Sequence, residues 1–94
     1  MDEKILTLHP AGKSGVNISR RKYDVILNAI IESLRAADEL TFGELTDAVR
    51  DKLQSSFDGS ISWYVTTVKL DAEARGLIQR VPKSRPQRLR LAAD

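Results

Sequence analysis

The chain has 94 residues, which is enough for one small domain. It contains no cysteine, and this excludes a disulfide framework, a thiolate zinc site and a cysteine nucleophile. No apolar run approaches the ~20 residues that cross a bilayer, and residues 1–4 lack the basic flank and apolar stretch of a signal peptide. We therefore expect a cytoplasmic protein with no membrane attachment.

The net charge of +2 is divided unevenly along the chain. Residues 1–74 carry nine Lys or Arg against twelve Asp or Glu, whereas residues 75–94 carry six against one. The stretch of residues 75–90 contains no acidic side chain at all. This asymmetry predicts a negatively charged partner that meets the C-terminal end of the protein.

The first half of the chain predicts an arm and two helices. Residues 5–8 could form a short strand or an arm that lies against the domain, and a loop rich in Gly and Pro follows. Apolar residues at three- and four-residue spacing predict a helix at about residues 20–37, with Ser19 as its N-cap. A connector then leads to a capping box of Thr41 and Glu44, which begins a second helix at residues 42–53.

The second half predicts a third helix and a β-hairpin. Ser60 can cap a helix at about residues 61–75, and Gly76 is a typical left-handed C-terminal residue. After Gly76 the pattern changes to that of strands, at residues 77–81 and 87–91, joined by a turn with two prolines and a basic tip. The expected core residues are Tyr23, Ile26, Ile30, Leu34, Phe42, Leu45, Val49, Val65 and Val68.

Three helices followed by a two-stranded hairpin is the order of a winged helix-turn-helix. Residues 67–78 (TVKLDAEARGLI) resemble the end of the recognition helix and the first wing strand of winged-helix regulators. Residues 63–65 (WYV), 70–71 (LD) and 86–89 (PQRL) together resemble an uncharacterised family of small bacterial proteins. The winged-helix resemblance covers residues 20–91 and implies an α+β fold: three helices, a C-terminal hairpin wing and an N-terminal arm or short strand. It divides the chain into an arm and loop at residues 1–18 and a winged-helix domain at residues 19–94.

The third helix carries polar residues beside its apolar face. At 100° per residue, its apolar residues Ile61, Val65, Val68 and Ala72 align towards the core, whereas Ser62, Thr66 and Lys69 lie about 80 to 100° away and Thr67 lies beyond them. Small hydroxyl and basic side chains are those that a major groove accepts. A solvated helix face fits them equally well, so both interpretations stay open.

Trp63 and Leu70 fall on the side of the third helix opposite the core. They could pack under the N-terminal arm, form a dimer interface, or place Trp63 against a sugar–phosphate backbone. Because packing is the commonest fate of large apolar residues, we favour the arm or a dimer. Part of the outer surface of this helix would then be occupied.

The hairpin is the most basic segment of the chain. Alternate strand residues share a face, so Arg88 and Arg90 are expected to point together, away from Leu89 and Leu91. Guanidinium groups bind phosphates in bidentate fashion, and an arginine at a loop tip can enter a minor groove. The alternative is that charge and proline merely protect an edge hairpin from aggregation. The lack of acidic neighbours favours nucleic acid.

No pattern in the sequence indicates catalysis, a metal site or a cofactor. His9 is the only histidine, and no nucleophile elbow of the form Gly-x-Ser-x-Gly is present. Residues 12–14 (GKS) resemble the end of a phosphate-binding loop, but Thr7 stands where that pattern requires glycine. The acidic residues of the second helix are mixed with Arg50 and Lys52, which indicates a solvated face.

The leading hypothesis is a winged-helix protein that binds double-stranded DNA, with transcriptional regulation as its role and a homodimer as one expected form. The third helix would contribute Ser60, Ser62, Thr66, Thr67 and Lys69, and the wing would contribute Arg80, Lys83, Arg85 and Arg88. The first helix begins with three basic residues, Arg20, Arg21 and Lys22, which are unfavourable at the positive end of the helix dipole. Their presence there indicates another use, as added contacts to the DNA backbone. The rival hypothesis is a protein-interaction or dimerisation module that does not bind DNA and uses Trp63 and Leu70. The acidity of the second helix favours this rival.

Overall fold

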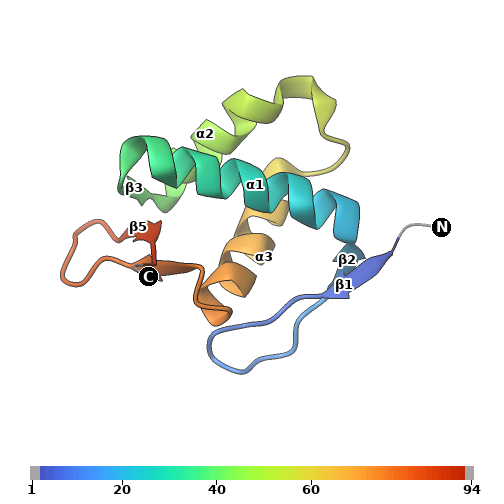
Figure 1. Ribbon diagram of the computed structural model, residues 1–94, viewed down its shortest axis with the longest axis horizontal. Helices are drawn as coiled ribbons and strands as arrows, with labels where there is room; N and C mark the ends of the chain where they lie inside the picture. The colour runs from blue at the N-terminus through green and yellow to red at the C-terminus, as the bar shows by residue number, and fades with distance from the viewer. Residues whose placement is uncertain (1–2, 93–94) are drawn as a thin grey trace.

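The computed structural model describes residues 3–92, and it confirms the α+β fold class (Figure 1). In chain order the elements are β1 (Lys4–Leu6), β2 (Asn17–Ser19), α1 (Arg20–Ala37), β3 (Leu40–Thr41), α2 (Phe42–Leu53), α3 (Ile61–Ala74), β4 (Ile78–Arg80) and β5 (Arg88–Leu91), with a 3₁₀ turn (Gln54–Ser56) after α2. Residues 1–2 and 93–94, at the outer ends of the predicted arm and domain, lie outside the described residues.

Each helix begins at a side-chain cap, as the sequence predicted. The Ser19 hydroxyl accepts a hydrogen bond from the Lys22 N–H at 3.3 Å, and the Ser60 hydroxyl accepts one from the Trp63 N–H at 3.2 Å. The capping box of α2 is complete, because the Thr41 side chain accepts from Glu44 N–H and the Glu44 carboxylate accepts from Thr41 N–H. Such caps satisfy N–H groups that have no partner inside the helix.

The C-terminal hairpin (β4, β5 and the turn between them) belongs to a three-stranded antiparallel sheet of order β3-β5-β4. Leu40 of β3 pairs with Leu89, and Ile78 of β4 pairs with Leu91. The two hairpin strands were predicted, each one or two residues longer than observed. Strand β3 was predicted only as a connector, because two residues are too few to show a strand period.

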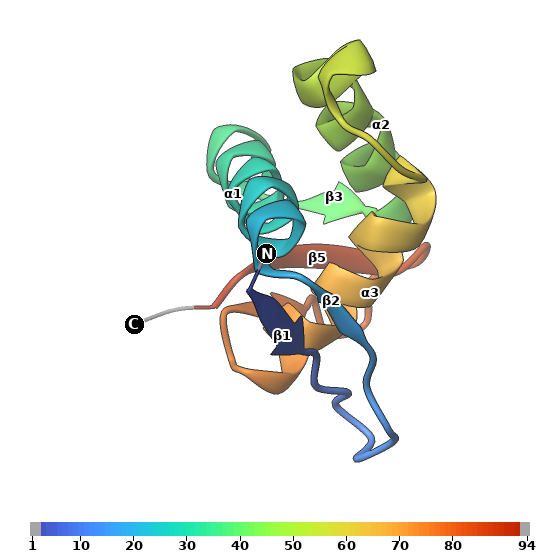
Figure 2. The ribbon, with the colours of Figure 1, turned by 90° about the vertical axis from the view of Figure 1, so that its right-hand side faces the viewer.

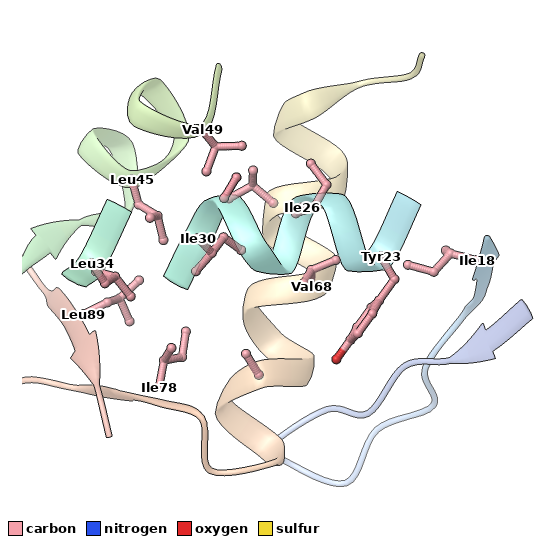
Figure 3. Close-up of a cluster of buried hydrophobic side chains, with 13 residues drawn as sticks. Ile18, Tyr23, Ile26, Ile30, Leu34, Leu45, Val49, Val68, Ile78 and Leu89 are labelled. Carbon is pink, nitrogen blue, oxygen red and sulfur yellow. The ribbon is translucent and has the colours of Figure 1, made fainter. Parts of the chain in front are cut away.

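The core lies where α3 crosses α1, with α2 and the inner face of the sheet closing it (Figures 1 and 3). Eight of the nine predicted core residues are buried. The prediction was wrong for Phe42, which is 37% exposed. Phe42 is the first residue of α2, and its side chain lies outside the core cluster. The centroid of its ring instead lies 5.6 Å from the Lys69 ammonium group.

The N-terminal segment is a second antiparallel hairpin, formed by β1, β2 and their connecting loop. Ile5 pairs with Ile18, and the backbone bond from Thr7 N–H to the Val16 carbonyl, at 2.9 Å, extends the pairing into the loop. Of the two predicted forms, strand or arm, the chain adopts a strand. In both views its loop lies beside the C-terminal end of α3 (Figures 1 and 2).

Candidate nucleic-acid interface

The outer face of α3 is divided into an open half and a covered half. Near its start, Ser62, Trp63 and Thr66 are exposed. Two turns further on, Leu70 and Thr67 are only half-exposed, because they line a small pocket with residues of the N-terminal hairpin. Only the first half of this face is therefore open to a large partner.

A buried carboxylate fixes the N-terminal hairpin to the covered half. Asp71 is fully buried, and its Oδ1 accepts a hydrogen bond from the Leu8 N–H at 2.8 Å. Its Oδ2 accepts from the Tyr23 hydroxyl of α1 and from the Arg75 Nε, the latter at 2.8 Å. We call these four residues the Asp71 cluster. Burial and the neighbouring carboxylate raise the pKa of Tyr23 to about 12, and the hydrogen bond to Asp71 raises the pKa of Arg75.

Because the Asp71 cluster fixes the position of the N-terminal hairpin, it determines which of the two outward-facing residues, Leu70 or Trp63, the hairpin covers. Leu70 lies beside the N-terminal hairpin, with which it lines a small pocket, and this agrees with the predicted alternative of cover by the arm. Trp63 does not share this cover, and 47% of it stays exposed. Trp63 stays uncovered because the N-terminal hairpin is attached at Asp71, through the Leu8 N–H, two helical turns beyond Trp63.

Two of the cations predicted to bind nucleic acid have an acidic partner inside the protein. Glu73 forms a salt bridge with Lys69 at 3.4 Å and accepts a hydrogen bond from Arg80 Nε at 3.2 Å, and the Lys69 and Glu73 side chains are only 14% and 7% exposed. Glu73 thereby ties the first strand of the C-terminal hairpin to α3. Lys69 and Arg80 are consequently placed to orient the hairpin, and they share the single negative charge of Glu73.

The hydroxyl groups at the start of α3 are arranged beside a cation that the sequence did not indicate. Arg50 of α2 donates from Nη2 to the Ser62 hydroxyl at 3.0 Å and from Nη1 to Asp47 at 3.2 Å. Thr66 donates to the Ser62 carbonyl, and the Ser60 hydroxyl is used by the cap. Sequence reasoning placed Arg50 among the acids of α2, because only the packing of α2 on α3 brings it to this surface.

The C-terminal hairpin presents the other predicted cations. Lys83 and Arg85 are exposed in its turn, which is held by bonds from the Arg88 N–H to the Ser84 hydroxyl, at 2.9 Å, and from Gln87 Nε2 to the Val81 carbonyl, at 3.1 Å. Arg88 and Arg90 lie on the sheet face opposite the buried Leu89. Within residues 3–92, no salt bridge joins Lys83, Arg85, Arg88 or Arg90 to an acidic residue.

Arg88 still has one acidic neighbour. Hydrogen bonds from Thr41 chiefly lower the pKa of Glu44, and the positive charge of Arg88 lowers it further. Arg88 is therefore attracted to the start of α2, whereas the turn cations Lys83 and Arg85 are the more available pair for an anionic partner.

Trp63 ends a row of three aromatic rings. Its ring meets that of Tyr64 edge-on, with centroids 4.9 Å apart, and Tyr64 meets Phe57 in the same way at 5.1 Å. The Lys22 ammonium group lies 5.5 Å from the centroid of Tyr64 and 5.9 Å from that of Phe57. The row therefore brings the basic start of α1 next to the open half of α3. Cation–π attraction of this kind holds Lys22 in place.

Residues 4–89 match the sequence model of a protein family described as "Family of unknown function (DUF6958)". The chain belongs to this family. The DUF6958 match begins at β1 and reaches β5, so it includes the N-terminal hairpin, the three helices and the turn of the C-terminal hairpin. It confirms the resemblance to an uncharacterised family. No curated protein and no solved structure matches the chain. Among the described residues, no helix combines the length and apolar character that a membrane crossing needs.

Proposed function

We propose that this protein binds double-stranded DNA as a winged-helix domain and acts in transcriptional regulation. The order of its elements supports this: a helix, a short strand, two helices and a hairpin whose second strand pairs with the short one. In helix-turn-helix domains the recognition helix reads base edges with its N-terminal residues. This proposal depends chiefly on one observation: this half of α3 is the open half, and among the described residues the turn and second strand of the C-terminal hairpin carry cations without salt bridges.

The contacts follow from what each side chain is free to do. Ser62, Thr66 and Arg50 would face a major groove from the start of α3, while Lys83 and Arg85 would reach phosphates or the adjacent minor groove. Arg88 would add a further phosphate contact. Ser60 and Thr67 would flank this surface, because one is used in a cap and the other is half-covered.

Salt dependence gives the test. Lys83, Arg85 and Arg88, which form no salt bridge among the described residues, would neutralise about three phosphates, so log Kd should change with log salt with a slope of magnitude about 2 to 3. Fluorescence anisotropy of a labelled mixed-sequence duplex, titrated with protein at several salt concentrations, measures this slope. Absence of binding at low salt would refute the proposal.

A pair of charge-matched variants locates the surface. Lys83→Ala/Arg85→Ala should weaken duplex binding by at least about ten-fold and reduce the slope by about 2. Lys4→Ala/Lys52→Ala removes the same charge from the N-terminal hairpin and from the far end of α2, where Lys52 lies 3.6 Å from Glu32. This control should bind like the unaltered protein. Equal losses of duplex affinity in both variants would mean that binding depends only on the net charge of the protein and not on the position of these residues.

A second candidate is a protein-interaction or dimerisation module, and the exposed apolar residues favour it. Leu6, Leu8, Val16 and Trp63 are each more than two-fifths exposed. Binding through such a surface would depend weakly on salt and strongly on Trp63. Sedimentation velocity over a range of protein concentrations tests for a homodimer directly.

A further inference from the structure

The indole of Trp63 is a large apolar group left exposed on the open half of α3. Its ring makes an edge-on contact with Tyr64, which in turn contacts Phe57 and lies near the Lys22 ammonium group. Its neighbours on the open half of α3, Ser62 and Thr66, are small. The contact with Tyr64 therefore orients the indole, while almost half of the surface of Trp63 is left exposed.

Two cations contact the sequence neighbours of this indole, one at Ser62 and one at Tyr64. Arg50 reaches the preceding residue, Ser62, with its Nη2, and Lys22 lies over the supporting Tyr64 ring. A second copy of the chain would bring the same cations face to face in a two-fold interface, where like charges repel. An anionic partner with a flat apolar surface suits this arrangement better, and a nucleic-acid base on its phosphate backbone has both properties.

We propose that Trp63 stacks on an unpaired base, so that the preferred ligand of this surface is a DNA duplex interrupted by an unpaired nucleotide. The inference rests on the proposed DNA-binding function. A fully paired duplex presents only base edges in its grooves, and the faces of its bases are stacked on one another. An indole gains a stacking partner only where a base has left the stack, and base–aromatic stacking tolerates any base because each has a π-face.

The proposal assigns distinct roles to the two parts of the interface. Lys83, Arg85 and Arg88 hold the phosphate backbone and contribute equally to paired and interrupted duplexes. Trp63 adds affinity only for the interrupted duplex. The preference should amount to about ten-fold, which is within the range that alanine substitution of stacking aromatics reveals.

The experiment compares a short fluorescein-labelled duplex with the same duplex carrying one additional thymine in one strand. Anisotropy gives the two Kd values, and unlabelled copies of both probes are used to follow indole fluorescence. Trp63 is the only tryptophan, so its emission reports this site alone. The unaltered protein should bind the interrupted duplex about ten-fold more tightly, with quenching of Trp63 by that probe.

Three variants identify the cause of the preference. Trp63→Ala should lose the preference and keep its affinity for the paired duplex within about two-fold, whereas Trp63→Phe should keep much of the preference because a phenyl ring also stacks. Leu77→Ala is the matched control, because Leu77 is also exposed but lies beyond the opposite end of α3. It should behave like the unaltered protein. Circular dichroism confirms that each variant is folded.

The contrary outcomes are distinguishable. Equal affinity for the two probes, or a preference that survives in Trp63→Ala, overturns this inference while duplex binding stands. Absence of binding to either probe at low salt overturns the proposed function and this inference with it. A change of Trp63 emission with protein concentration, without nucleic acid, would assign the indole to a second copy of the chain and also overturn the inference.

Discussion

Replacing Asp71 by asparagine should remove the buried charge that joins three parts of the molecule. The carboxylate receives three donors: the Leu8 N–H, the Tyr23 hydroxyl and the Arg75 guanidinium. Asparagine has nearly the same shape, but it offers one acceptor oxygen in place of two. The Leu8 amide would therefore compete with the other two donors for that oxygen, and the new NH₂ group would face at least one donor.

The expected loss follows from the individual bonds. A hydrogen bond from a neutral donor to a charged group contributes about 1.5 to 3 kcal/mol, and one such bond would be lost or severely weakened. The Arg75 side chain is 37% exposed, so solvent screening limits its ion pair to about 1 kcal/mol or less. Together these contributions predict that Asp71→Asn lowers the free energy of unfolding by about 3 kcal/mol. This is a large share of the roughly 5 to 15 kcal/mol that stabilises a domain.

Urea unfolding followed by far-ultraviolet circular dichroism measures this loss. The control is Asp51→Asn, at an exposed carboxylate of α2 for which we expect a change within about 0.5 kcal/mol. A loss below about 1 kcal/mol for Asp71→Asn would refute the view that this carboxylate is a major anchor. Should that variant not fold, the milder Tyr23→Phe, which removes one donor, should still lose about 1 to 2 kcal/mol.

Two further predictions concern the same half of the molecule. The pKa of Tyr23 is raised from 10.0 to about 12, so the folded state holds the phenolic proton more tightly than the unfolded chain does. The resulting stability is fully present below pH 10 and is lost as the pH rises towards 12. The advantage of the unaltered protein over Tyr23→Phe, about 1 to 2 kcal/mol below pH 10, should therefore fall by about 2 to 3 kcal/mol over this range and change sign, in urea titrations at successive pH values, and a constant difference would contradict it. At Gly15, an added Cβ would lie 1.7 Å from the Thr7 carbonyl oxygen, so Gly15→Ala should disrupt the N-terminal hairpin and increase its cleavage in limited proteolysis. Gly43→Ala, in open space within α2, is the control and should be neutral or stabilise by up to about 1 kcal/mol; equal cleavage of the two variants would contradict the prediction.

The helices were predictable from sequence because their signals are local. Each starts at a residue whose hydroxyl reaches an N–H only three positions away, and α3 ends next to Gly76, whose φ is +77°. Such signals do not depend on the rest of the fold. Phe42 shows the limit of the same reasoning, since its spacing fits the apolar face of α2 while its position in the first turn leaves it exposed.

The parts of the interface that were missed depend on contacts distant in sequence. Arg50 meets Ser62 across twelve positions, and Asp71 meets Leu8 across sixty-three. The Lys69–Glu73 pair could be read from helical spacing, but the addition of Arg80 to it requires the hairpin to fold back onto α3. The sequence therefore identified the basic residues of this surface, but only tertiary packing determines which of them are free of an acidic partner within the protein.

The separation in sequence of the groups around Asp71 also bears on the kinetics of folding. Its donors include Tyr23, forty-eight positions away, and Leu8, which lies further still. Closing loops of this size costs chain entropy before any contact repays it. We therefore expect the bonds to Asp71 to form after the transition state, which a φ-value near zero for Asp71→Asn would show. Interactions made late act mainly on the unfolding rate. On this expectation the carboxylate should govern how long the native state persists once formed, far more than how quickly the chain reaches it.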